Sequence, residues 1–238
     1  MIALYNQIIY YPLLNLLVFL YNVIPGHDIG VVIILLTALI RLALAPSFQK
    51  SLKSQAIMSN LQPKLNELRE RYKGDKEGMA KATMELYKEH KINPLSSCLP
   101  LLVQLPILIA LYQVFNEALS AKADIALRLT GLYNFVQRPE FINPNLFGIL
   151  DLSRPNLILG VLAGLSQFWQ SKMMLSQNTQ STDPTAKIMA VQTTYVLPII
   201  SIVIAAKLPA GLPLYWIVTT VFSIAQQYYV MRKPKASG

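Results

Sequence analysis

The stretch that decides the fold is residues 29–45, which read IGVVIILLTALIRLALA. Arg41 is its single charged residue. The hydrocarbon core of a bilayer is about 30 Å thick, so a helix that spans it needs about 17–25 apolar residues. Backbone groups in lipid must hydrogen-bond within their own segment, so such a run is expected to be helical. We therefore predict a membrane-spanning helix here.

Four runs further along the chain have a similar length and no charged residue. They cover residues 92–116, 155–171, 188–206 and 208–231. Across the 238 residues, 53% are hydrophobic and only 14% are charged, whereas soluble domains carry roughly 25% charged residues. The predicted fold class is an all-α polytopic membrane protein with five transmembrane helices.

The N-terminal segment, residues 2–24, is also uncharged but carries a polar stripe. Gln7, Tyr11, Asn15 and Asn22 fall on one face of a helix. This stripe favours an amphipathic helix that lies at the membrane interface, and a sixth span is the alternative. In the interfacial arrangement we expect four tyrosines at headgroup level, namely Tyr5, Tyr10, Tyr11 and Tyr21.

Basic residues are unevenly distributed and indicate the orientation. Residues 50–91 hold ten of the 21 lysines and arginines. Positively charged loops stay in the cytoplasm. Residues 50–91 are therefore predicted to be cytoplasmic, together with the loop at 177–187 and the C-terminus, and residues 120–154 are predicted to lie outside.

The predicted cytoplasmic segment reads as a helical hairpin. Gly74 and Asp75 mark its turn, and Pro63 is expected to kink the first arm. Each arm carries an apolar stripe, through which the two could pack antiparallel. The stripes are Ile57, Leu61, Leu65, Leu68 and Tyr72 on one arm, and Ala80, Met84, Tyr87 and Lys91 on the other. The pattern favours a solvated connector over a docking surface.

The sequence contains few residues suited to catalysis. Its only histidines are His27 and His90, and its only cysteine is Cys98, which we interpret as a small buried residue. It has no His-Glu-x-x-His, glycine-rich phosphate loop or Gly-x-Ser-x-Gly motif. We expect no catalytic residue, no metal and no cofactor, and the protein is not predicted to be an enzyme.

Arg41 is the exception in an apolar stretch. It lies about 18 Å along the helix from Ile29, where a charge is expensive and usually faces protein or water. A snorkelling arginine that reaches headgroups is the alternative. Thr37 lies one turn away on the same face, and uncharged polar residues recur in the other spans. These features permit a hydrated cavity with one fixed positive charge.

Four landmarks carry a resemblance to a known family. They are TALIR at 37–41 followed by Pro46, LQP at 61–63 with LYKEH at 86–90, NPLSSCLPLLVQLPI at 93–107, and LPAGLPLYW at 208–216 with Gln226 and Gln227. In this order and spacing the chain resembles the YidC family of membrane protein insertases, which includes mitochondrial and chloroplast relatives.

The resemblance implies five helices around a hydrophilic groove that opens to the cytoplasm and to lipid. It places an essential arginine at Arg41 and further groove positions at Thr37, Gln104, Tyr215 and Trp216. We add Gln167, a polar residue of the third predicted span. The resemblance also makes residues 2–24 an interfacial helix, and it makes the hairpin a contact for incoming chains.

The implied function is that of an insertase and chaperone in the bacterial plasma (inner) membrane. It would receive hydrophobic segments of nascent membrane proteins, translocate short polar tails and release the helix into lipid. Implied partners are nascent membrane proteins and membrane lipids, with the Sec translocon and the ribosome as further candidates, and no specific nucleic-acid binding is expected. A small transporter or channel with a charged cavity is the rival function, against which stands the lack of internal repeats.

The predicted organisation follows these segments in order. It comprises an interfacial helix at 1–26, transmembrane helices at 27–49, 92–119, 155–176, 188–207 and 208–231, a cytoplasmic hairpin at 50–91, an outer segment at 120–154, a cytoplasmic loop at 177–187 and a cytoplasmic tail at 232–238.

Overall fold

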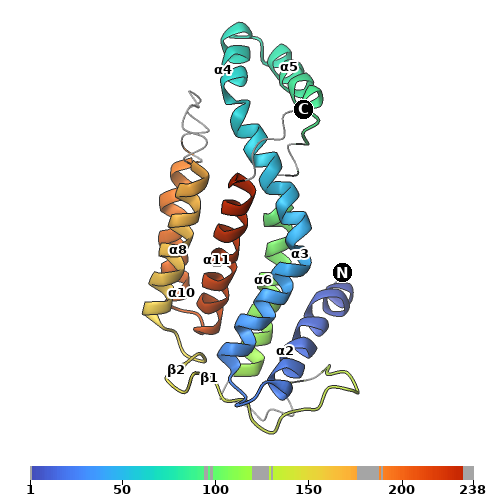
Figure 1. The fold of residues 1–238 in the computed structure, drawn as a ribbon, viewed down its shortest axis with the longest axis vertical. Coiled ribbons are helices and arrows are strands. Elements are labelled where there is room, and N and C mark those ends of the chain that lie inside the picture. Colours follow the sequence, from blue (N-terminus) through green and yellow to red (C-terminus); the bar gives the residue numbers. More distant parts are fainter. Residues whose placement is uncertain are drawn as a thin grey trace.

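A computed structural model describes residues 2–93, 96, 99–119, 129, 131–175, 188 and 190–232. Cys98, the predicted loop at 177–187, most of the predicted tail and residues 120–128 of the predicted outer segment lie outside these described residues. Within them the chain is mostly helical, as predicted, and the long helices lie side by side (Figure 1).

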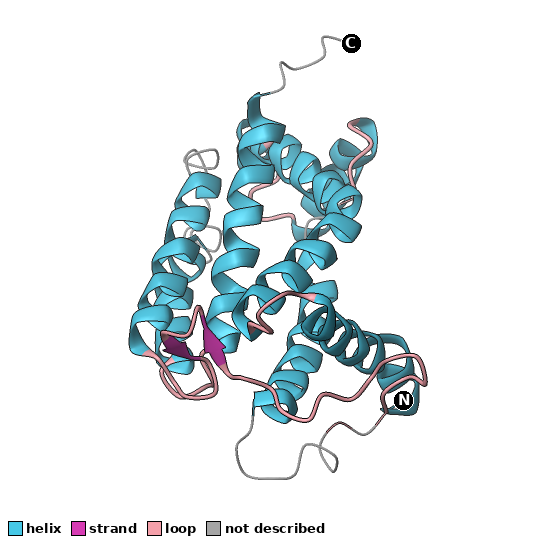
Figure 2. Cartoon of the chain, turned by 60° about the horizontal axis from the view of Figure 1, so that its bottom comes forward, coloured by secondary structure: helices cyan, strands magenta, loops and turns pink. Residues whose placement is uncertain are grey.

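The N-terminal segment is one continuous helical rod. It consists of α1 (Ile2–Tyr5), the π-helical turn η1 (Asn6–Tyr10) and α2 (Tyr11–Val23). The rod packs against the neighbouring helices α3 and α6, and it leans away from the other long helices, with the N-terminus at the side of the molecule (Figures 1 and 2).

Part of the polar stripe of this rod bonds to protein, at Asn15 and Asn22, whereas Gln7 is exposed. Asn15 is buried, and its side chain donates to the carbonyl oxygen of Gly131 at 3.0 Å and accepts from the amide of Tyr133 at 2.6 Å. The placement of Tyr10 and Tyr21 at headgroup level stays a prediction. Both side chains are buried in the core, at 7% and 4% exposure. The reason is that each hydroxyl has a protein partner. Tyr10 donates to the Glu117 carboxylate, and Tyr21 accepts from the amide of Asn143 at 2.9 Å.

The next helix, α3 (Ile29–Asn60), is 32 residues long, or about 48 Å. The Asp28 side chain caps it by accepting from the amide of Val31 at 3.0 Å. It continues through Pro46, so the predicted boundary near residue 50 coincides with no helix break. The break comes at Leu61, and Pro63 lies in the first turn of the following helix, where its missing N–H costs nothing.

Two short helices follow, α4 (Gln62–Arg71) and α5 (Lys76–Glu89). Gly74, with φ of +95°, turns the chain between them, and Asp75 caps α5 by accepting from the amide of Gly78 at 2.9 Å. Ile57 and Met84 of the predicted stripes are exposed. A small apolar cluster joins the two helices, formed by Leu61, Leu65, Leu86 and Ile92 with Met58, Leu68 and Tyr87 against it.

The remaining helices are α6 (Leu99–Leu119), α8 (Leu157–Leu175), η3 (Gln192–Val196), α10 (Leu197–Ala205) and α11 (Gly211–Arg232). α11 packs extensively on both α3 and α8, and α8 also holds α10. Close approach of α8 and α10 requires a glycine. A Cβ added to Gly164 would lie 2.4 Å from Cγ1 of Ile202 and 3.1 Å from the backbone oxygen of Pro198.

The main core lies at the end of the molecule away from α4 and α5. Fully buried side chains from the N-terminal rod, α3, α6 and the start of α11 meet there, among them Leu14, Ile33, Phe115 and Tyr215. The segment that leads to α8 covers this end with a two-stranded antiparallel hairpin, β1 (Asn145–Leu146) and β2 (Leu150–Asp151). Its backbone oxygens at Arg154 and Leu152 accept from the amides of Ala210 and Gly211, at 3.0 and 3.2 Å. The segment that leads to α8 is therefore hydrogen-bonded to the start of α11 at this end of the bundle.

Among the described residues, three helices are long and apolar enough to cross a membrane, by length and composition. They are Ala3–Val23, Ile29–Asn60 and Leu102–Leu119, and Gln192–Ala205 is a shorter apolar helix. The structure thus confirms a mostly helical chain with apolar, membrane-length helices.

Candidate functional site

A polar cavity of about 440 Å³ lies where α3, α6, α8, α10 and α11 face one another. α11 lies between the α3 side and the α8–α10 side, because it packs on both. Most lining side chains end in a hydroxyl or an amide, and Arg41 is the charged residue among them. The lining residues are Arg41, Phe48, Leu52, Gln55, Gln104, Ala163, Gln167, Gln170, Ser171, Met174, Thr193, Leu197, Ser201, Trp216, Thr219, Thr220, Ser223 and Gln226.

Arg41 is 3% exposed and points its guanidinium toward α11. Its Nη2 donates to the carbonyl oxygen of Thr219 at 3.1 Å and to Oγ of Ser223. Its Nε is buried and makes no hydrogen bond with any residue that the structure describes. No carboxylate forms an ion pair with Arg41 in the described part of the chain. The cavity therefore contains a buried positive charge that no carboxylate of the described residues neutralises, and such a charge is costly in a protein interior.

An aromatic ring covers one face of this charge. Phe48 lies two helical turns beyond Arg41 on α3, and its ring centroid is 4.4 Å from Cζ of Arg41. A guanidinium over a ring is stabilised by the negative face of the π system, by about 0.5–2 kcal/mol. Phe48 thus offsets part of the desolvation of Arg41 without neutralising it.

Four of the six predicted groove residues line the cavity: Arg41, Gln104, Gln167 and Trp216. Oε1 of Gln167 accepts from Oγ of Ser201 at 2.7 Å, which links α8 to α10 across one wall. Nε2 of Gln104 donates to the hydroxyl of Tyr215 at 2.5 Å, which links α6 to α11. The amides therefore hold the walls together as well as lining them.

The other two predicted residues, Thr37 and Tyr215, lie behind the wall. Each is 1% exposed, and neither lines the cavity. Oγ1 of Thr37 donates to the carbonyl oxygen of Ile33 at 2.6 Å, so its polar atom is satisfied within its own helix. Tyr215 belongs to the main core and reaches Gln104 only through its hydroxyl. Thr37 and Tyr215 thus lie in supporting positions behind this cavity, and their predicted place in the groove stays a prediction.

Sequence reasoning missed Phe48 and the role of Ser223. Both could have been found from helical spacing. Phe48 follows Arg41 by seven residues, and Ser223 follows Trp216 by seven, so each pair shares a helix face. The missing information was which face of α11 meets Arg41, which only the packing of α11 on α3 reveals.

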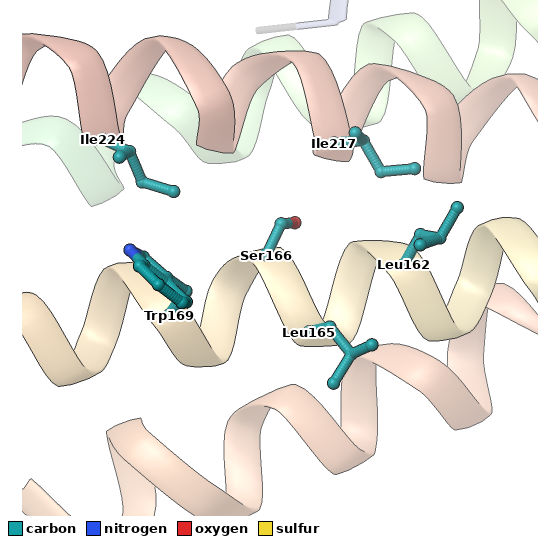
Figure 3. Close-up of a pocket in the computed structure, with 6 residues that line it drawn as sticks. All are labelled: Leu162, Leu165, Ser166, Trp169, Ile217 and Ile224. Carbon is teal, nitrogen blue, oxygen red and sulfur yellow. The ribbon is translucent and has the colours of Figure 1, made fainter.

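A second cavity, of about 390 Å³, lies on the other side of the contact between α8 and α11. Figure 3 shows Leu162, Ser166 and Trp169 of α8 pointing toward Ile217 and Ile224 of α11. Ser166 provides the one hydroxyl group among the lining residues. This hydroxyl donates to the carbonyl oxygen of Ala163 in its own helix at 2.8 Å. Trp169 is 65% exposed. This apolar cavity offers nothing to a charged ligand.

The polar cavity presents groups that can bind a polar or charged segment. Among the described residues, its lining contains no histidine, cysteine, aspartate or glutamate, and no group of three or more such side chains could hold a metal ion. What the site offers is one fixed cation, uncharged hydrogen-bonding groups and an indole. It is suited to transient contact with a polar or anionic segment.

Comparison with known proteins assigns the chain to a family. The sequence profile of the "60Kd inner membrane protein" family matches residues 19–237. The chain is 41% identical over 225 residues to a membrane protein insertase YidC of Magnetococcus marinus, which covers 93% of this chain and 35% of that protein. It is 39% identical over 211 residues to the YidC insertase of Francisella tularensis subsp. novicida, covering 87% of this chain and 33% of that protein.

The chain spans about a third of the length of these two relatives. The match nonetheless includes α3, α6, α8, α10 and α11, and with them every residue that lines the polar cavity. The chain therefore belongs to the 60Kd inner membrane protein family, the family of the YidC insertases.

Proposed function

We propose that this protein is a membrane protein insertase whose polar cavity receives the polar tail of an incoming membrane protein. The observation that carries the proposal is Arg41, a buried cation without a carboxylate partner among the described residues, in a cavity walled by amides and hydroxyls. The two relatives that bear the name of membrane protein insertase support it.

In the proposed arrangement five spans surround the cavity as a groove, namely α3, α6, α8, the run that contains η3 and α10, and α11. The N-terminal rod lies at the outer interface, with a sixth span as the alternative. The end that carries α4 and α5 faces the cytoplasm, because it holds the densest cluster of basic residues. The opposite end, closed by the main core and the β1–β2 hairpin, then faces outward.

This arrangement shortens the path of a polar tail through hydrocarbon. Each charged side chain costs about 2.5–3.5 kcal/mol at the centre of a bilayer. A hydrated groove that reaches Arg41 removes the cytoplasmic part of that barrier, and the guanidinium can hold an acidic side chain of the tail transiently. The apolar segment that follows then leaves sideways into lipid, driven by the hydrophobic effect.

The proposed partners follow from this path. Nascent membrane proteins are the substrates, and membrane lipids receive the released helix. The α4–α5 pair is a first contact for incoming chains, and the Sec translocon and the ribosome are candidate neighbours. The proposed location is the bacterial plasma membrane, with the C-terminus in the cytoplasm.

Insertion into liposomes that contain only this protein tests the proposal. The client is a short single-span protein with an acidic N-terminal tail, and the readout is protection of that tail from external protease. We expect protection with the wild type, a loss of tenfold or more with Arg41→Ala, roughly as for other deleted charge contacts, and an intermediate value with Arg41→Lys. A client whose acidic residues are replaced by amides is the matched control.

Two outcomes contradict the proposal. Equal protection with Arg41→Ala and wild type would remove the charge from the mechanism. Absence of protection above protein-free liposomes, combined with flux of small solutes through vesicles that contain the folded protein, would favour a transporter or channel.

A further inference from the structure

We infer that Ser223 and Phe48 are positioning residues that hold the guanidinium of Arg41 at a fixed point of the polar cavity. This inference rests on the proposed function and adds to it the residues that decide where the charge is presented. Neither residue would touch the client carboxylate; each acts through Arg41.

The hydrogen bonds around Ser223 determine that its hydroxyl accepts from Arg41. The hydroxyl of Ser223 donates its hydrogen to the carbonyl oxygen of Thr219 at 3.0 Å. A serine hydroxyl has one hydrogen and two acceptor lone pairs, so it can meet Arg41 only as an acceptor. Nη2 of Arg41 donates to Oγ of Ser223 and also to the oxygen of Thr219, at 3.1 Å. The three groups therefore form a closed set with matched donors and acceptors.

Phe48 restrains the guanidinium from another direction. Its ring lies 4.4 Å from Cζ of Arg41 and is carried by the same rigid helix, two turns toward α4. An unrestrained arginine would extend its long side chain toward the nearest polar surface. With Nη2 bonded to α11 and the ring against one face, Arg41 stays 3% exposed inside the cavity.

The restraint leaves part of the cation available. A guanidinium has five N–H donors in a fixed plane, and the described residues accept only from Nη2 of Arg41. The Nε group is buried without a partner in the described part of the chain. Because Nε is buried, a visiting carboxylate would meet the terminal Nη1, which has no acceptor among the described residues.

An alternative role is purely structural, in which the contact simply ties α3 to α11. The two roles differ in how they depend on the client. A tie between helices stabilises the cavity for every client, whereas a positioned charge matters only to clients that carry an acidic tail. The two helices also pack against each other over many residues, so loss of one hydroxyl leaves them packed.

The experiment compares Ser223→Ala and Phe48→Leu with their conservative partners Ser223→Thr and Phe48→Tyr. Each variant is reconstituted in liposomes and tested for tail protection with the acidic-tail client and its amide-substituted control. For Ser223→Ala and Phe48→Leu we expect a roughly three- to tenfold loss with the acidic tail, as for a lost hydrogen bond or ring contact to a charged group. The amide control should change less than about twofold, and Ser223→Thr and Phe48→Tyr should restore insertion.

A double-variant series separates the inference from the proposed function. If Ser223 acts through Arg41, Ser223→Ala should cause no further loss in an Arg41→Ala protein, since the two effects are coupled. Equal losses with both clients, or an additional loss in the Arg41→Ala background, would overturn the positioning role while leaving the charge step intact. A wild-type level of insertion by Arg41→Ala alone would instead overturn the proposed charge step itself.

Discussion

The two cavities on either side of the α8–α11 contact have similar volumes, but only one of them is lined mostly by side chains that carry hydroxyl or amide groups. The polar cavity is lined by Gln167 and Gln170 of α8, and the apolar cavity by Leu162, Leu165 and Trp169 of the same helix. α11 shows the same division, with Ser223 and Gln226 on one side and Ile217 and Ile224 on the other.

This contrast shows that opposite faces of one helix can border surroundings of different polarity. Residues three and four apart share a face, and residues two apart do not. Ile224 and Gln226 are two residues apart and lie in different cavities. A window average of hydropathy merges the two faces, whereas the helical period separates them. In the proposed arrangement, water fills the polar cavity and lipid borders the apolar one.

The largest expected effect comes from placing a new positive charge in the lining of each cavity in turn. Ile224→Arg should lower the free energy of unfolding by about 2.5–3.5 kcal/mol, because it buries an unpaired charge against lipid. Gln226→Arg, at nearly the same depth, should cost less than Ile224→Arg, since water in the polar cavity hydrates the new cation and screens its repulsion by Arg41, which lines the same cavity. Unfolding of both variants in mixed detergent–lipid micelles measures the difference. Equal costs would show that the two faces do not differ in solvent.

The two tryptophans of the chain offer a smaller and more direct contrast. Trp169 lines the apolar cavity and Trp216 lines the polar cavity. In liposomes, brominated acyl chains should quench Trp169 more strongly than Trp216. Acrylamide in water should show the reverse order, since it reaches Trp216 through the polar cavity. Single-tryptophan proteins made by Trp216→Phe and Trp169→Phe allow each signal to be read alone. Identical quenching by both agents would contradict the assignment of water and lipid.

The smallest expected effect concerns two serines, one from the lining of each cavity. Oγ of Ser201 donates from α10 to Gln167 of α8 at 2.7 Å, whereas Oγ of Ser166 donates within its own helix at 2.8 Å. Ser201→Ala should lower the free energy of unfolding by about 0.6 kcal/mol, the average for such a bond between membrane helices. Ser166→Ala should change it by less than half as much. A larger cost for Ser166→Ala would indicate that the apolar cavity uses this hydroxyl.

The sequence by itself determined the class of fold and the central charge. Long uncharged runs can satisfy their backbone in lipid only as helices, and one arginine within such a run must find a polar partner. The match of the family profile to residues 19–237 agrees with the resemblance read from the four landmarks. The resemblance placed Gln104 and Trp216 in the groove, and the polar residues of the third span suggested Gln167. These three line the cavity together with Arg41.

Only the tertiary structure decided which face meets which neighbour. Thr37 and Arg41 share a face of α3, yet Thr37 is buried behind the cavity wall, because the main core begins at that level of the helix. Tyrosine is a residue type typical of membrane interfaces. Packing of the N-terminal rod on other segments nevertheless gives the hydroxyls of Tyr10 and Tyr21 protein partners. Ser223 became the partner of Arg41 because α11 packs on α3 in this one rotation. Periodicity fixes the relative positions of residues on a helix, whereas the rotation and neighbours of that helix depend on contacts distant in sequence.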